Sequence, residues 1–201
     1  MYDIVMCGIP RSGSTLVWQI LQSIFPRQKI IKNHPGSWEA DGSMVISSIR
    51  NPYDITASLV RVRMSRERRK EINGKDVRQE LTWMEKNFNS LKDILIGPHT
   101  PVLRYEEFYC NYDIIYNMIE KEFRIDIPEN IREKLNYKYS LEANKNRALA
   151  LKDFYDIDKD QIHGDHIGHV VPGYWKDYLP EWIIGKVMKV CEPIAKEWGY
   201  E

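Results

Sequence analysis

Apolar residues recur along the chain in two alternating patterns, short continuous runs and longer segments with a helical period. The first run, Asp3 to Gly8, predicts a short buried strand. The segment that follows Gly13 places apolar residues three and four positions apart as far as Phe25, which predicts an amphipathic helix. A glycine-bearing turn joins the two. The chain therefore begins with a strand, a tight loop and a helix.

The same alternation continues towards the middle of the chain. Further strands are predicted at residues 29–32, 44–49 and 101–105. Helices are predicted from Pro52 onward, over 77–95 and around 113–123, and Asn51 is a suitable cap for the first of these. Alternating strands and helices favour an α/β fold of three layers, with a central parallel sheet flanked by helices, and in such sheets ligands bind at the carboxyl ends of the strands.

The last third of the chain has weaker patterns. Residues 124–181 are polar and rich in turns, with a short helix near 129–135, whereas 182–198 has an apolar stripe typical of a helix that packs on a core. The length of 201 residues is that of one domain, so residues 1–201 are expected to form a single domain.

Composition narrows the range of partners. The 29 basic residues balance 29 acidic ones, which argues against a nucleic-acid or membrane partner and requires any anion site to be local. Cys7, Cys110 and Cys191 are odd in number and widely spaced, which favours buried free thiols in a reducing compartment. Because the chain also shows neither a leader-like start nor a membrane-spanning apolar run, we expect a cytoplasmic protein.

The segment from Gly8 to Thr15, GIPRSGST, has the composition of an anion-binding loop. It lies between a strand and a helix, where backbone N–H groups and the positive end of the helix dipole converge. Arg11 is its cation. The segment fits the Walker A pattern except that Ser14 replaces the lysine, and the strand at 44–49 ends in Arg50 instead of a magnesium-binding aspartate. A nucleoside triphosphatase is therefore a poor match, and no metal is expected.

Two motifs together resemble the family of sulfotransferases that use 3′-phosphoadenosine 5′-phosphosulfate (PAPS). PRSGST resembles the 5′-phosphosulfate loop of that family, and IRNPYDITAS resembles its 3′-phosphate motif, in which an arginine and a serine stand eight positions apart, as Arg50 and Ser58 do. The resemblance implies a fold like that of the P-loop nucleoside triphosphatases. It assigns PAPS to five loop residues and to Arg50 and Ser58; the loop residues are Arg11, Ser12, Gly13, Ser14 and Thr15.

The segment between these motifs, KIIKNH, is similar to the strand end that carries the general base of the family. The resemblance makes His34 the base that deprotonates the acceptor, and it places Lys32 and Arg11 near the leaving phosphate. A histidine suits this role because its ordinary pKa of about 6.5 lets it accept a proton near neutrality. The spent cofactor would be 3′-phosphoadenosine 5′-phosphate (PAP).

Two later segments also resemble the family. LRYEEF is similar to a strand end whose tyrosine, here Tyr105, lies near the nucleotide. The segment up to PGYWK is similar to the part in which an Arg-Lys-Gly triplet closes over the 3′-phosphate. The triplet positions here read Gly168, His169 and Val170, so the arginine is absent and His169 is the remaining donor. An aromatic residue that follows the loop in many members is replaced by Leu16, for which Trp18 is a candidate substitute.

Several alternatives stay open at this point. A magnesium-dependent nucleotide or nucleoside kinase, or a nucleotide-binding protein without catalysis, would share the loop. Glu39 or Asp41 could orient His34 or replace it as the base, and His163, His166 and His169 could hold a metal. The basic run from Arg61 to Lys70 is typical of a solvated helix face, but it could also steer an anionic acceptor or nucleic acid, and its position after the 3′-phosphate helix leaves a role at the mouth of the cleft open. The acceptor, a hydroxyl or amine on a small molecule or carbohydrate, and the oligomeric state are not indicated.

Overall fold

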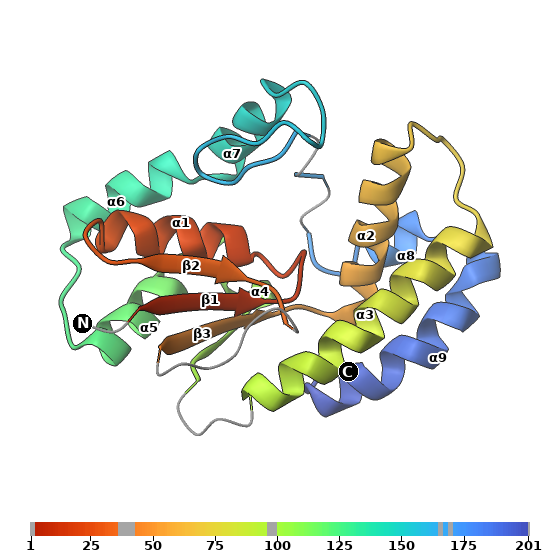
Figure 1. Cartoon of the computed structure of the whole chain (residues 1–201), viewed down its shortest axis with the longest axis horizontal. Coiled ribbons are helices and arrows are strands. Elements are labelled where there is room, and N and C mark those ends of the chain that lie inside the picture. Colours follow the sequence, from red (N-terminus) through yellow and green to blue (C-terminus); the bar gives the residue numbers. More distant parts are fainter. Residues whose placement is uncertain (1–2, 36–42, 96–99, 165–166, 169–170, 201) are drawn as a thin grey trace.

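The central element is a four-stranded parallel sheet. The computed structural model describes residues 3–35, 43–95, 100–164, 167–168 and 171–200, and these contain the strands in the order β2-β1-β3-β4 (Figure 1). The four strands are β1 Ile4–Gly8, β2 Ile30–Asn33, β3 Met44–Ile49 and β4 Val102–Arg104. Each lies within two residues of its predicted position, and the predicted parallel α/β sheet is confirmed.

The strand register brings three chain exits to one edge of the sheet. Cys7 at the end of β1 pairs with Asn33 on one side and Ser47 on the other, and Gly8 pairs with Ser48. The chain therefore leaves β1, β2 and β3 at neighbouring points, and the residues that follow these strands are brought together although they are far apart in the sequence.

Helices connect the strands and cover the sheet. In the described part of the chain they are α1 Ser14–Ile24, α2 Pro52–Arg66, α3 Gly74–Leu95, α4 Tyr105–Phe108, α5 Asp113–Phe123, α6 Glu129–Lys138, α7 Leu141–Leu149, α8 Trp175–Tyr178 and α9 Glu181–Glu197. The predicted cap is confirmed, because Asn51 Oδ1 accepts a hydrogen bond of 3.0 Å from Tyr53 N. Helix α7 was not predicted. Its buried residues are Asn144 and Ala148, so it has no apolar stripe from which a helix could be predicted.

Two hydrophobic clusters hold these elements. One joins the sheet to α1, α4, α5 and α6, and the other joins α2, α3 and α9. In Figure 1, α1 and α6 of the first group lie at the left of the view, and α2, α3 and α9 of the second group lie at the right. Within the second group, helix α2 is largely buried, including its polar residues Asp54 and Ser58. This burial is the first sign that α2 borders a site.

Two expectations drawn from composition meet the structure here. Cys7 and Cys191 are buried as expected, but Cys110 is exposed, because it lies in the short polar connection between α4 and α5. Among the described residues, no helix is both long enough and apolar enough to cross a membrane.

The second cluster should contribute a large part of the stability. Phe88 of α3 is fully buried, with its ring centroid 4.3 Å from that of Trp198. We expect Phe88→Ala to lower the free energy of unfolding by about 3–5 kcal/mol, since it removes buried apolar area and leaves a cavity. Urea unfolding followed by circular dichroism measures this. Trp83→Ala, on the same helix but 37% exposed, is the control and should cost much less; equal losses would contradict this account.

Candidate anion-binding site

The loop after β1 turns sharply before α1 begins. Arg11 and Gly13 have φ angles of 78° and 80°, in the left-handed region. At Gly13 a side chain is excluded for a second reason, because a Cβ atom would lie 2.8 Å from the rings of Tyr105 and Phe108. The glycine therefore allows α4 to pack directly on the start of α1.

Ser12 supports the loop from inside. Its hydroxyl donates to the carbonyl oxygen of Ile9 at 2.6 Å and shares a 2.7 Å hydrogen bond with Ser48 Oγ at the end of β3. The side chain is fully buried. Of the loop hydroxyls expected to face the anion, that of Ser12 is thus engaged within the protein, and it ties the loop to the neighbouring strand.

The loop is in contact with the second motif, although the two are about 40 residues apart in the sequence. Arg11 of the loop contacts both Arg50 and Ser58. Arg11 Nε donates to Ser58 Oγ at 2.8 Å, and Arg50 Nη1 donates to the carbonyl oxygen of Arg11 at 3.3 Å. Burial is the main cause that lowers the pKa of Arg11 to about 9, and the nearby cations Arg61 and Arg50 lower it further. Two guanidinium groups therefore share one small region.

Arg50 is a buried cation whose hydrogen bonds are incomplete. The residue is 3% exposed, and its guanidinium stacks on the ring of Tyr105 at 4.1 Å. The nearest carboxylate oxygen of Asp54 lies 4.0 Å away. Within the described part of the chain, Nε and Nη2 have no hydrogen-bond partner. A buried charged donor without a partner is costly, so this arrangement suits an anion that accepts from Arg50.

Asp54 connects the site to the late segment of the chain. Its carboxylate is fully buried and accepts hydrogen bonds from Gly173 N at 2.7 Å and Trp175 N at 3.2 Å. Burial raises its pKa, whereas these two bonds and Arg50 act in the opposite direction. Sequence reasoning missed this role. The available signal was an acidic residue within IRNPYDITAS, in the first turn of a helix that follows an arginine.

Lys32 and His34, at the end of β2, lie on the other side of the loop. Lys32 Nζ donates to Thr15 Oγ1 at 2.7 Å, and burial together with the charge of Arg11 lowers the pKa of Lys32 to about 8. His34 Nδ1 is 2.8 Å from the carbonyl oxygen of Gly8. Because a carbonyl only accepts, Nδ1 carries the proton, and Nε2 is the basic nitrogen of the neutral ring. Burial lowers the pKa of His34 as well, so the neutral form is favoured.

One pocket contains most of these residues and extends beyond them. Its polar end is formed by Arg11, Thr15, Arg50 and Ser58. Its other end is lined by aromatic and aliphatic side chains; these are Leu16, Tyr109, Tyr112, Leu141, Ile162 and Ile167. Tyr105 stands between the two ends. The pocket therefore combines anion-binding groups with an apolar compartment of the kind that accepts a planar ring.

Trp18 does not replace the aromatic residue missing at Leu16. Its indole N–H donates to the carbonyl oxygen of Ile30 at 3.2 Å, and the ring is buried between α1 and β2 in the first hydrophobic cluster. The prediction was wrong because Trp18 lies two positions along α1 and so on a different face of the helix from Leu16.

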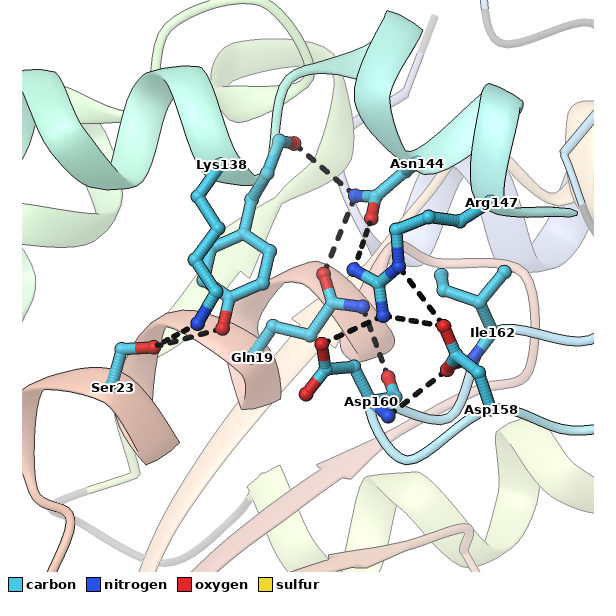
Figure 2. A network of polar contacts seen from close by, with 9 residues as sticks. Gln19, Ser23, Lys138, Asn144, Arg147, Asp158, Asp160 and Ile162 are labelled. Atoms are coloured by element: carbon cyan, nitrogen blue, oxygen red, sulfur yellow. Dashed lines mark hydrogen bonds and ion pairs between the residues drawn. The ribbon is translucent and has the colours of Figure 1, made fainter.

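A polar network fixes the far wall of the pocket (Figure 2). Gln19 of α1 donates to the carbonyl oxygen of Asp160 at 3.0 Å and accepts from Asn144 of α7 at 3.3 Å. Arg147 of α7 reaches Asp158 at 2.9 Å and Asp160 at 2.7 Å. These contacts hold the segment before Ile162 against α1, although the two are about 140 residues apart in the sequence.

Some predicted residues fall outside the described part of the chain. These are His169, the candidate phosphate donor, and also Glu39, Asp41 and His166. The ring of His163 stacks on Phe154 at 4.9 Å, and its Nδ1 is 3.0 Å from the carbonyl oxygen of the same residue. Across the residues that the structure describes, no three histidine, cysteine or acidic side chains are grouped as a metal would require.

Comparisons with known proteins give matches in structure but not in sequence. Neither the protein-family models nor the curated protein sequences yield a match to this chain. Mouse sulfotransferase SULT7A1 complexed with PAP superposes with a TM-score of 0.69 at 14% identity, over 94% of this chain and 82% of that one. Retinol dehydratase in complex with androsterone and PAP gives 0.68 at 16% identity, over 96% and 80%.

A domain of similar length is also similar to this chain throughout. The sulfotransferase domain from the curacin biosynthetic pathway has a TM-score of 0.58 at 14% identity, over 100% of this chain and 98% of that domain. At such low identity these likenesses establish architecture. The chain has the P-loop-like α/β fold of the PAPS-dependent sulfotransferases.

Proposed function

We propose that this chain is a sulfotransferase that moves a sulfuryl group from PAPS to a hydroxyl or amine of a small-molecule acceptor. The observation that carries the proposal is Arg50, a buried guanidinium with unpartnered donors among the described residues, which lies in hydrogen-bond contact with the anion loop. The structural neighbours support it, since SULT7A1 and retinol dehydratase are complexes with PAP.

PAPS carries two anionic groups on one ribose, and the pocket offers a group of donors for each. Arg50 and Ser58 would bind the 3′-phosphate, because Arg50 presents a planar fork and Ser58 a hydroxyl. The loop from Arg11 to Thr15 would bind the 5′-phosphosulfate at the start of α1, through backbone N–H groups and the hydroxyls of Ser14 and Thr15. The apolar end of the pocket, beyond Tyr105, would then receive the adenine.

The residues for the chemistry lie at the end of β2. His34, whose Nδ1 lies 2.8 Å from the carbonyl oxygen of Gly8, would take the proton of the acceptor hydroxyl on Nε2, the basic nitrogen of the neutral ring. The acceptor oxygen would form a bond to sulfur while the bond from sulfur to the 5′-phosphate oxygen breaks. Lys32 and Arg11 would stabilise the charge that develops on that phosphate, which is released as PAP.

The acceptor is proposed as a small molecule by analogy with the neighbours. Retinol dehydratase has been solved with androsterone and with retinol. The carboxylates Glu39 and Asp41, which would favour a carbohydrate acceptor chemistry, lie outside the described residues. An acceptor screen should therefore begin with simple alcohols, phenols and amines.

The cofactor assignment predicts a specific loss on removing one guanidinium. Wild-type protein should bind PAP in calorimetric titration without added metal, and Arg50→Ala should lower the affinity at least about 30-fold, since a buried charged contact is worth about 2 kcal/mol or more. AMP, which lacks the 3′-phosphate, should bind weakly to both proteins. Arg50→Lys is the matched control and should fall between them, because lysine keeps the charge but not the fork.

ATP with magnesium distinguishes the main rival. A preference of the wild type for ATP with magnesium over PAP would contradict the sulfotransferase proposal and favour a kinase. Tight binding of PAP without turnover of any acceptor in the screen would favour a nucleotide-binding protein without catalysis.

The proposed base predicts a separation of chemistry from binding. With any acceptor that the screen identifies, His34→Ala should lower kcat by about 10²–10⁴-fold, the usual contribution of a general base. The affinity for PAP should stay within about twofold of wild type, because His34 is not assigned to the nucleotide. Equal loss of kcat and of PAP affinity would show that His34 is structural.

The lowered pKa values predict a displaced pH profile. Because burial lowers the pKa of His34, the fall of kcat/KM on the acid side should have its midpoint below pH 6.5. It should decline above about pH 8, as Lys32 loses its proton. Lys32→Arg, measured across pH 5–10, should shift this decline upward because a guanidinium keeps its proton. A decline that is unchanged in Lys32→Arg would remove Lys32 from the mechanism.

A further inference from the structure

Helix α2 carries another cation on the side that borders the pocket. Arg61 follows Ser58 by three positions, so the two side chains leave neighbouring points on one face of the helix. Ser58 lines the pocket together with Arg11 and Arg50. Arg61 is therefore placed one turn beyond a residue assigned to the 3′-phosphate.

Gly168 lies directly against this arginine. A Cβ atom built at Gly168 would lie 2.9 Å from Arg61 Cδ, and closer still to Nε and Cζ of the guanidinium. Gly168 itself lines the same pocket as Arg50 and Ser58. The absence of a side chain at position 168 is thus what allows the Arg61 guanidinium to reach this side of the pocket.

The charge of Arg61 acts on the same groups, in agreement with its contact with Gly168. After burial, Arg61 is the largest cause that lowers the pKa of Arg11. Arg50, Arg61 and Arg11 all act to lower the pKa of the buried Tyr174, against the effect of burial. Arg11 and Arg50 therefore line the pocket, and Arg61 lies behind Gly168 at its border, close enough to act on the same groups. Such mutual repulsion favours a ligand group that carries more than one negative charge.

We propose that Arg61 is a phosphate-binding residue. The family resemblance expects an arginine at position 168, where this chain has glycine, and Arg61 of α2 would supply that cation instead. This inference rests on the proposed function. A side chain at position 168 and the guanidinium of Arg61 need the same space, so the two positions exclude each other as sources of the cation. On α2 the cation stands on a helix packed against α3 and α9 instead of on a loop.

The first experiment compares two nucleotides that differ by one phosphate. PAP and AMP are titrated into wild type, Arg61→Ala and Lys70→Ala, where Lys70 is an exposed basic residue just beyond the same helix. We expect Arg61→Ala to lower the affinity for PAP at least tenfold and the affinity for AMP by no more than about twofold. Lys70→Ala should leave both affinities unchanged. Arg61→Lys, which keeps the charge, should weaken PAP less than Arg61→Ala and serves if the alanine variant is unstable.

The second experiment moves the cation back to the late segment. Gly168 does not have a positive φ, so an arginine is compatible with its backbone once Arg61 is removed. Gly168→Arg alone should lower the affinity for PAP, because the new side chain overlaps Arg61. The double variant Arg61→Ala with Gly168→Arg should bind PAP more tightly than either single variant.

The outcomes separate this inference from the proposed function. Wild-type protein that fails to bind PAP would overturn both. PAP binding that is lost in Arg50→Ala but unchanged in Arg61→Ala would overturn only the role of Arg61. Equal weakening of PAP and AMP by Arg61→Ala would also overturn it, since the residue would then not act through the 3′-phosphate.

Discussion

The buried guanidinium of Arg50 is the group on which the arrangement of the site depends. It stands at the end of β3, stacks on Tyr105 of α4, donates to the backbone of the loop at Arg11, and faces Asp54 of α2. Each of these contacts joins a different element to the strand. Because the remaining donors of Arg50 have no partner among the described residues, the same contacts that order the elements leave one position unsatisfied, and an anion fits there.

Asp54 extends this arrangement to the end of the chain. A fully buried carboxylate beside a buried arginine would be costly if it were unpaired, but it also accepts from the backbone of Gly173 and Trp175. The segment before α8 is thereby fixed to the first turn of α2. This backbone contact anchors the late segment beside the anion site, where Arg50 Cζ also lies 5.8 Å from the centroid of the Tyr174 ring.

The sequence predicted the parts of the molecule that have local signals. The strands followed from short apolar runs, the helix α2 from Asn51 and Pro52, and the loop from its glycines and serines. Features that depend on distant contacts were not predictable in this way. Helix α7 is held by the network of Gln19, Asn144 and Arg147 and has no apolar stripe, and the contact of Arg61 with Gly168 joins positions over 100 residues apart.

Two residues, Trp18 and Arg61, show why the direction of a side chain was not predictable from the sequence. Trp18 was considered for the pocket because it is near Leu16 in the sequence, whereas position around the helix sends it into the core. For Arg61 the sequence favoured a solvated basic run, and only the structure shows that it lies against Gly168. In both cases the sequence gives the residue type but does not show which way the side chain points from its helix.

The cations of the site also explain why its two halves differ in character. Arg11 and Lys32 both have a lowered pKa, which means that burial and mutual repulsion oppose their charges in the protein without ligand. A bound polyanion would relieve that repulsion, so ligand binding and protein stability are linked at this end of the pocket. The apolar end has no such repulsion between like charges, because the network of Figure 2 pairs its polar groups with one another. Under the proposed function, the phosphate end would therefore contribute most of the affinity, and the apolar wall would contribute shape.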